Sequence, residues 1–127
     1  MGKQIVHTPE APSSFAGYSQ AVKANGFVFV SGQGPFDADG RVIGETIQEQ
    51  TRQCLTNVKA ILEAAGSTMD DIVQATFILA EDTDFVGMNE EWNHWFKTNP
   101  PARQGARLPV RPKGMRISIA CIATVRS

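Results

Sequence analysis

The chain has 127 residues, of which 42% are hydrophobic and 20% are charged, and its formal net charge is −1. This composition is typical of one soluble globular domain over residues 1–127, and no apolar stretch approaches the roughly 20 residues that a membrane-spanning helix needs. The residues after Met1 lack the apolar segment of a secretory signal, so the expected location is the cytoplasm.

Charge is distributed unevenly along the chain. All 13 acidic residues lie at or before Glu91, and only basic residues follow: Lys97, Arg103, Arg107, Arg111, Lys113, Arg116 and Arg126. A locally positive surface attracts anions. Alternatively, these side chains pair with acids from the first two thirds of the chain once it folds. The sequence leaves both interpretations open.

Residues that bind metals or form disulfides are sparse. Cys54 and Cys121 are far apart, and each lies in an apolar pattern that is typical of buried free thiols. His7 and His94 have no cysteine or carboxylate at ligand spacing. We therefore expect neither a disulfide nor a metal site.

The first predicted element is a hairpin. Residues 18–24 and 26–33 look extended, and Asn25-Gly26 between them is a typical two-residue turn. The second run contains Phe27-Val28-Phe29-Val30, which is apolar on both faces and favours a central strand. A further turn is expected at residues 37–40.

A helix is predicted over residues 46–65. Thr46 and Glu49 form a capping-box pattern, in which each side chain can satisfy a backbone N–H at the helix start. Gly66 is the expected stop. The residues that recur at three- and four-residue spacing form one stripe: Ile47, Thr51, Cys54, Leu55, Val58, Ile61, Leu62 and Ala65.

Three more elements follow. Residues 72–80 alternate as a strand, and residues 84–97 form a second helix that Pro100-Pro101 prevents from extending. Residues 115–125 form the last strand. One of its faces is apolar, and the other is mixed: Arg116, Ser118, Ala120, Ile122, Thr124 and Arg126.

These elements predict an α+β fold. Two helices and about six strands suit a mixed sheet with both helices on one face. The other sheet face then needs cover, because a large apolar surface in water is unfavourable, and oligomerisation is a common solution.

One arginine stands out as a candidate ligand-binding residue. Arg103 follows Pro100-Pro101, which restricts the backbone before it, and Gly105 comes two residues later. A stationary guanidinium can hold a small carboxylate through two parallel charge-assisted hydrogen bonds, each contributing roughly 1.5–3 kcal/mol. An ordinary surface ion pair is the alternative for this side chain.

A series of short motifs, in order and at matching spacing, resembles the reactive intermediate deaminase family (RidA/YjgF), also called L-PSP endoribonucleases. The motifs cover nearly the whole chain: Ala11-Pro12, Gly17-Tyr18-Ser19-Gln20, Val30-Ser31-Gly32-Gln33, residues 53–58 and 62–66, residues 85–89, Pro101-Ala102-Arg103, and residues 117–123. The resemblance implies a chorismate-mutase-like fold that trimerises through its sheets, with ligand clefts between the subunits. It also implies cofactor-free hydrolysis of enamine and imine intermediates, released by pyridoxal-phosphate enzymes, to 2-oxo acids and ammonia.

The resemblance also assigns roles to residues. Arg103 matches the arginine that binds the substrate carboxylate, and Tyr18 matches a tyrosine of the cleft. For Tyr18 a buried packing role is the alternative, and for Asn89, a helix residue near the cleft, it is a packing hydrogen bond. Ser31 and Gly32 match the strand end where a hydroxyl and a backbone N–H meet the ligand.

Two positions depart from the family pattern. The ungapped match places Ala120 where the deaminases carry a glutamate proposed to position the attacking water, and Gly105 where a cysteine is usual. A positioned acid–base group contributes roughly 10²–10⁴-fold to such proton transfers. Ser118, two residues earlier on the same face, keeps a hydroxyl, and Gly105 keeps the backbone N–H.

The register after Arg103 leaves a question about two arginines. Arg107-Leu108-Pro109 resembles the Arg-Leu-Pro before the last strand in many relatives, but that register needs an insertion and supplies no glutamate. In the ungapped match, Arg107 and Arg111 become unusual residues near the cleft or the trimer edge.

The sequence supports three hypotheses of function. The leading one is an imine/enamine deaminase similar to 2-iminobutanoate/2-iminopropanoate deaminases, in a variant subgroup without the glutamate. The second is a non-enzymatic module that binds a small carboxylate, which Ala120 favours. The third is an endoribonuclease role, supported only by the basic C-terminal third. Because the sequence pI is near 6 and no RNA-binding motif occurs, nucleic acid is not an expected partner.

Overall fold

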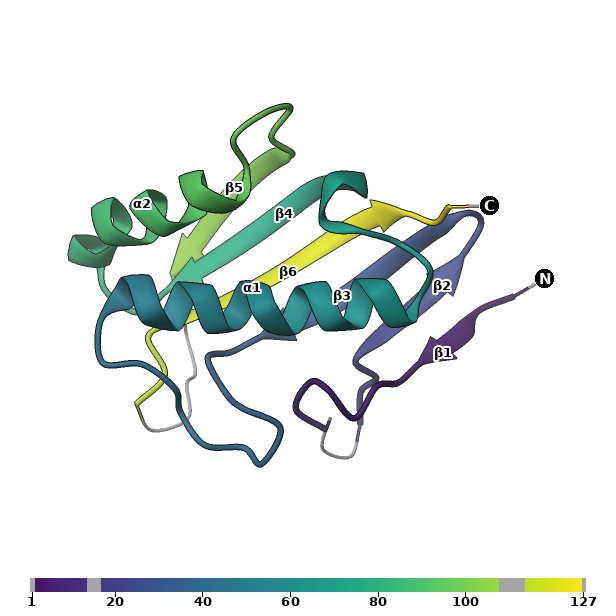
Figure 1. Cartoon of the computed structure of the whole chain (residues 1–127), viewed down its shortest axis with the longest axis horizontal. Coiled ribbons are helices and arrows are strands. Elements are labelled where there is room, and N and C mark those ends of the chain that lie inside the picture. The colour runs from purple at the N-terminus through teal and green to yellow at the C-terminus, as the bar shows by residue number, and fades with distance from the viewer. Residues whose placement is uncertain (1, 14–16, 108–113, 127) are drawn as a thin grey trace.

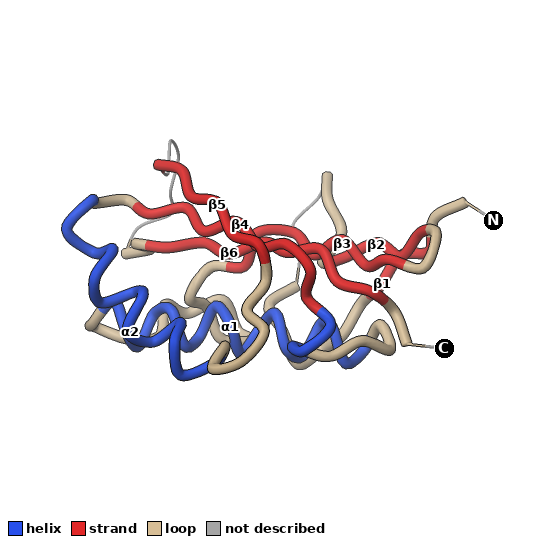
Figure 2. Tube along the Cα trace, turned by 90° about the horizontal axis from the view of Figure 1, so that it is seen from above, coloured by secondary structure: helices blue, strands red, loops and turns tan. Residues whose placement is uncertain are grey.

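The computed structural model describes residues 2–13, 17–107 and 114–126 as a six-stranded mixed sheet covered on one face by two helices (Figures 1 and 2). This is the predicted α+β architecture. The elements in chain order are β1 (Gln4–Val6), β2 (Ala21–Ala24), β3 (Phe27–Gln33), α1 (Ile47–Ala64), β4 (Ile72–Leu79), α2 (Phe85–Trp95), β5 (Ala102–Arg107) and β6 (Ile117–Thr124). Short 3₁₀ turns at Met69–Asp71 and Asp82–Asp84 precede β4 and α2.

The strands lie in the order β1-β2-β3-β6-β4-β5. All neighbours are antiparallel except β4 and β5, which run parallel because α2 carries the chain back between them. β6, the last strand along the chain, therefore lies in the middle of the sheet, and β5 forms one edge.

The hairpin turn between β2 and β3 is confirmed. Asn25 and Gly26 both have positive φ, at 52° and 83°, as a turn matched to the twist of its strands requires. β2 is shorter than expected and begins at Ala21, although the carbonyl of Gln20 still accepts from the N–H of Ser31 on β3. The buried side-chain amide of Gln20 donates to the carbonyls of Thr8 and Pro12 and accepts from the N–H of Thr8.

Helix α1 begins and ends as predicted. Thr46 accepts a hydrogen bond from the N–H of Glu49, and Glu49 accepts one from the N–H of Thr46, so the capping box is complete. At the other end Gly66 has φ 83°, and the N–H of Ser67 donates to the carbonyl of Leu62, which closes the helix in a Schellman motif.

The core lies between the sheet and α1. Its strand side includes the predicted apolar face of β6, and its helix side includes the predicted stripe of α1, as the buried residues Val28, Val30, Ile117, Ile119, Leu55, Val58, Ile61 and Leu62 show. Cys54 and Cys121 are both buried and unpaired, as predicted. Burial raises the pKa of both thiols, that of Cys121 to about 12, so neither is suited to act as a nucleophile.

Two strands and one bulge were not expected from the sequence. β1 has only three residues, and every residue of β5 is exposed, so neither carries a clear apolar alternation. β4 does not alternate strictly, because its pairing with β6 shifts between Ile72 and Gln74 and leaves Val73 45% exposed.

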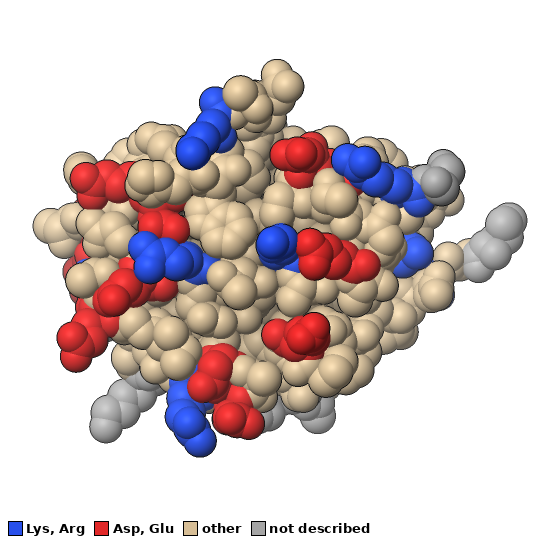
Figure 3. Space-filling view, viewed as in Figure 1, with Lys and Arg blue, Asp and Glu red and all other residues tan. Residues whose placement is uncertain are grey.

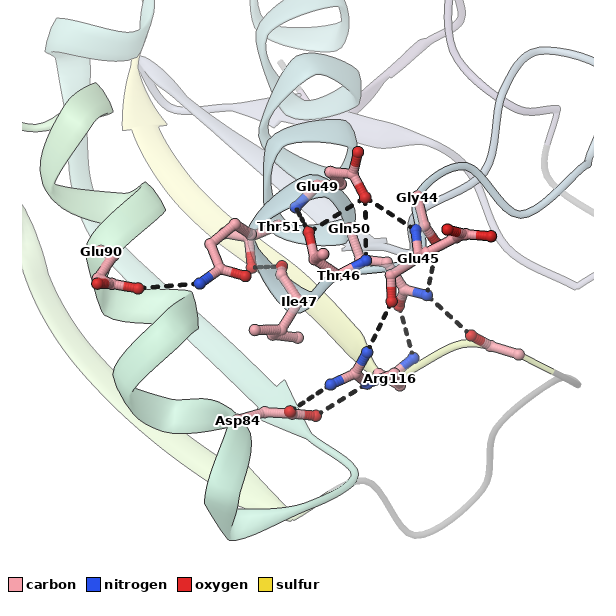
Figure 4. Close-up of polar contacts among 12 residues, drawn as sticks. Gly44, Glu45, Thr46, Ile47, Glu49, Gln50, Thr51, Asp84, Glu90 and Arg116 are labelled. Atoms are coloured by element: carbon pink, nitrogen blue, oxygen red, sulfur yellow. Dashed lines mark hydrogen bonds and ion pairs between the residues drawn. The ribbon is translucent and has the colours of Figure 1, made fainter.

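A polar junction ties the start of α1 to α2 and β6 (Figure 4). The guanidinium of Arg116 forms an ion pair with the buried carboxylate of Asp84 and donates to the carbonyl of Glu45, while Gln50 accepts from the N–H of Arg116. Arg126 pairs with Asp71 in a similar way. Arg116 and Arg126 therefore pair with acidic residues from earlier in the chain, which is one of the two interpretations that the sequence left open.

Candidate functional site

Arg103 lies near the start of edge strand β5, where it faces α2. Its partner on β4 is Ala75, a buried residue, so Arg103 is on the helix-covered side of the sheet. Its Nη1 donates a hydrogen bond of 2.8 Å to the side-chain oxygen of Asn89. Asn89 therefore forms the hydrogen bond that was the alternative to ligand contact, and this bond orients the guanidinium of Arg103.

Three aromatic rings surround the same guanidinium. Its Cζ is 5.2 Å from the ring centre of Phe77 on β4, 5.7 Å from that of Phe85 and 5.1 Å from that of Trp92, both on α2. Aromatic faces attract a cation and restrict its movement. The described side chains that hold Arg103 in place are therefore neutral.

No described acidic side chain neutralises the charge of Arg103. None of the ion pairs found among residues 2–13, 17–107 and 114–126 includes Arg103, and the residue is exposed. The surface ion pair considered from the sequence therefore does not form within the described part of the chain. An oriented, uncompensated guanidinium is suited to an anionic ligand from solution.

Gly105 makes room for one of the rings. A Cβ atom at this position would lie 2.3 Å from Cζ of Phe77, far inside van der Waals contact. The glycine therefore lets the Phe77 ring pack over β5 and reach Arg103. A shallow hollow of about 390 Å³ opens beside it, lined by Phe77, Leu79, Asp82, Phe85, Gly105, Ala106 and Arg107.

The other candidate residues gather at the end of β3. The hydroxyl of Ser31 donates to the carbonyl of Ser19 at 2.6 Å, and the N–H of Ser31 donates to the carbonyl of Gln20 at 2.9 Å. Ser31 thereby fixes the segment next to Tyr18, and its oxygen remains able only to accept a further hydrogen bond. Tyr18 is 52% exposed in the single chain, so packing within the chain does not bury it.

Gly32 brings Ser118 into this group. β3 is irregular between Val30 and Gln33, and a Cβ at Gly32 would lie 2.7 Å from Oγ of Ser118. Ala120 lies further along the same face of β6, opposite Thr76 of β4. Of these two positions, 118 is therefore the one whose side chain meets the end of β3.

The two groups are separate within one chain. Arg103, Ala75, Cys121 and Val30 are successive partners across β5, β4, β6 and β3. Three strand spacings of about 4.8 Å place the backbone of Arg103 about 14 Å from that of Val30, next to Ser31. The two groups therefore do not adjoin within one chain.

The basic residues do not form one surface. On the face seen in Figure 3, basic and acidic side chains are interspersed. Arg107 is exposed, and Arg111 lies outside the described residues. Within the described residues, no group of three or more His, Cys, Asp or Glu side chains could hold a metal ion. No helix in that part of the chain is long and apolar enough to span a bilayer.

Comparison with known proteins places this architecture in one family. The model of the family described as Endoribonuclease L-PSP matches residues 8–125. A RutC family protein of Pyrococcus horikoshii is 41% identical over 95% of this chain and 97% of its own length. The human 2-iminobutanoate/2-iminopropanoate deaminase is 35% identical over 95% of this chain and 89% of its own length.

A solved structure agrees with these relatives. The crystal structure of Escherichia coli TdcF with bound serine superposes with a TM-score of 0.88 at 34% identity, over 98% of this chain and 99% of that one. The chain therefore belongs to the L-PSP endoribonuclease family, the RidA/YjgF family of reactive intermediate deaminases.

The sequence did not identify the aromatic residues around Arg103. The sequence predicts a helix over residues 84–97 and a strand over residues 72–80, but it assigns no site role to Phe85, Trp92 or Phe77. The signal was present, because Phe85, Asn89 and Trp92 are spaced by four and three residues and so share a face of α2.

Proposed function

We propose that this protein is an imine deaminase that hydrolyses 2-imino acids to 2-oxo acids and ammonia. The observation that carries the proposal is the guanidinium of Arg103, which Asn89 orients and no described carboxylate neutralises. Relatives with deaminase names, among them the human protein, support the reaction class. A cytoplasmic location stays a prediction.

The site is completed by a second copy of the chain. Because about 14 Å separates the two candidate groups within one chain, the Arg103 of one subunit meets the Tyr18–Gly32 group of its neighbour. The edge position of β5 leaves Arg103 accessible to such a neighbour. We propose a homotrimer, as the family resemblance implies.

The face of the sheet opposite the helices supplies the contact surface. The paired residues Ile5, Val22, Phe29 and Ile122 form an apolar row across β1, β2, β3 and β6 on this face. Ile5 is 55% exposed and Phe29 44% exposed in the single chain. Burial of this row against other copies removes apolar surface from water and stabilises the assembly.

The chemistry requires few protein groups. Arg103 holds the carboxylate while water adds to the electrophilic carbon of the protonated imine and loses a proton, which gives a carbinolamine. The nitrogen then gains a proton and leaves as ammonia as the C–N bond breaks, and the hydroxyl oxygen forms the C=O bond of the 2-oxo acid and loses its proton. The hydroxyls of Tyr18 and Ser118 order the water and relay protons. Holding the imine and the water in a reactive arrangement accelerates the reaction, and this compensates in part for the missing acid–base group.

The direct test is the lifetime of an imine. An amino-acid oxidase generates the imine, and semicarbazone formation reports how long it survives with and without the protein. Wild-type protein should shorten the lifetime, and Arg103→Ala should lose most of this effect, by about 10²-fold, because a charge-assisted bidentate contact disappears. Lys59→Ala, which removes an exposed positive charge from α1, is the matched control. Equal activity of Arg103→Ala and wild type would refute the proposal.

A second function is favoured by the lack of a carboxylate at positions 118 and 120. The same cleft can act as a receptor that binds a small carboxylate without turnover. Saturable binding of a 2-oxo acid, lost in Arg103→Ala, together with unchanged imine lifetimes would support the receptor over the enzyme.

A further inference from the structure

A cavity opens beside the Tyr18–Gly32 group and extends away from it. Its volume is about 470 Å³, within the range of small-molecule sites. The walls beyond Tyr18 and Gly32 are largely apolar and include Pro12, Phe36, Ala38 and Met115, with polar side chains from Ser13, Gln20 and Gln33.

Buried amides hold both walls of this cavity. On one side, the side chain of Gln20, 2% exposed, donates to the carbonyl of Pro12. On the other, the side chain of Asn57, 1% exposed, donates to the carbonyls of Gly34 and Phe36. Because these amides donate hydrogen bonds to backbone carbonyls of the walls, the backbone around the cavity is fixed and the cavity is preformed.

The described residues that line the cavity supply no positive charge to hold an anion. Among the described lining residues, Asp39 is the only charged one, and it lies at the exposed rim. A carboxylate is therefore disfavoured inside, whereas an apolar group gains from leaving water. The anionic and apolar parts of one ligand are thus directed to two places, Arg103 and this cavity.

We propose that the cavity receives the side chain of the substrate, and that the protein prefers 2-imino acids with a bulky apolar side chain, such as a branched alkyl group, over those with a methyl group. The inference rests on the proposed function, because it takes Arg103 of the neighbouring subunit as the anchor of the same ligand. Gly32 lies between the positions of the carboxylate and of the apolar side chain of the ligand, and it has no side chain that would obstruct either.

Binding of product-like acids tests the cavity without requiring turnover. Calorimetric titration of the full-length protein with pyruvate and with 4-methyl-2-oxopentanoate compares a methyl with an isobutyl side chain. The larger acid should bind about tenfold or more tightly, because three more carbons leave water. Ala38→Phe, which fills the cavity from an exposed turn, should abolish this preference, and Phe36→Ala, which widens the cavity, should change it. Ala64→Phe makes the same change on an exposed residue of α1 and should keep it.

The outcomes separate this proposal from the proposed function. Equal affinity for the two acids, or a preference that both Ala38→Phe and Phe36→Ala leave unchanged in folded protein, overturns the side-chain cavity. Hydrolysis of the imines of alanine and leucine at equal rates also overturns it but leaves the deaminase intact. A preference in binding without any effect on imine lifetime supports the cavity and refutes the deaminase.

Discussion

Gly105→Ala should disable the anion site although it removes no contact from the ligand. The new Cβ would lie 2.3 Å from Cζ of the Phe77 ring, and carbon atoms in contact are about 3.5–4.0 Å apart. The ring must therefore retreat by at least about 1.2 Å. That movement separates the ring from the Arg103 guanidinium, whose Cζ is 5.2 Å from the ring centre.

The expected cost has two parts. Overpacking typically destabilises a protein by about 1–3 kcal/mol, and the lower end applies here because Phe77 is only half-buried. Weakening the cation–π contact adds about 0.5–1 kcal/mol. The melting temperature should fall by about 5–8 °C, and the affinity for pyruvate should fall several-fold because Arg103 is no longer held in one position.

A double-mutant cycle with Phe77→Leu isolates this cause. Leucine leaves space above β5, so Gly105→Ala should cost little in the Phe77→Leu background. Thermal denaturation at one fixed protein concentration and pyruvate titration should both give a coupling of about 1 kcal/mol. If the two substitutions are additive in both measurements, the ring does not depend on the glycine and the reasoning is wrong.

Three further predictions concern other parts of the chain. Hydrogen bonds from Arg52 and Trp95 lower the pKa of Glu91 below its ordinary value of 4.5, so the ionised group stabilises the fold above that pH and the effect is lost as the pH falls. Glu91→Gln should reduce the free energy of unfolding by about 1 kcal/mol at pH 7, and denaturant titrations should show the difference shrink as the pH falls below the ordinary carboxyl range. Ser31→Ala should lose about 1 kcal/mol of stability by denaturant titration, and a loss within 0.3 kcal/mol of zero would contradict its role in fixing Ser19. The two thiols, whose pKa values burial raises, should resist a thiol reagent at pH 8 in native protein and react only on unfolding; fast native reaction would show that they are accessible.

Local sequence patterns predicted most of the fold. The stripe and capping box of α1, the Asn25-Gly26 turn and the apolar face of β6 each depend on local sequence, and the structure has all of them. β5 was missed because its residues are all exposed and it is defined by hydrogen bonds to β4, which lies some 28 residues earlier in the chain. Pairing between distant segments leaves little local signal.

The site was predictable in its residues but not in its geometry. The resemblance gave Arg103, Tyr18 and Gly32, whereas the rings around Arg103 come from three elements that only the fold brings together. The reason for Gly105 could not be read from the sequence either, because the obstacle to a side chain there is Phe77 of the neighbouring strand.

The central position of β6 has a consequence for how the chain reaches its native state. β1, β2 and β3 share no ladder with β4 and β5, so the two halves of the sheet are joined only through β6. Until β6 is available, β3 and β4 both present unpaired edges that can associate with other chains. A chain cut before residue 114 should therefore aggregate as two unjoined halves, and during synthesis the sheet closes only after its last strand has emerged.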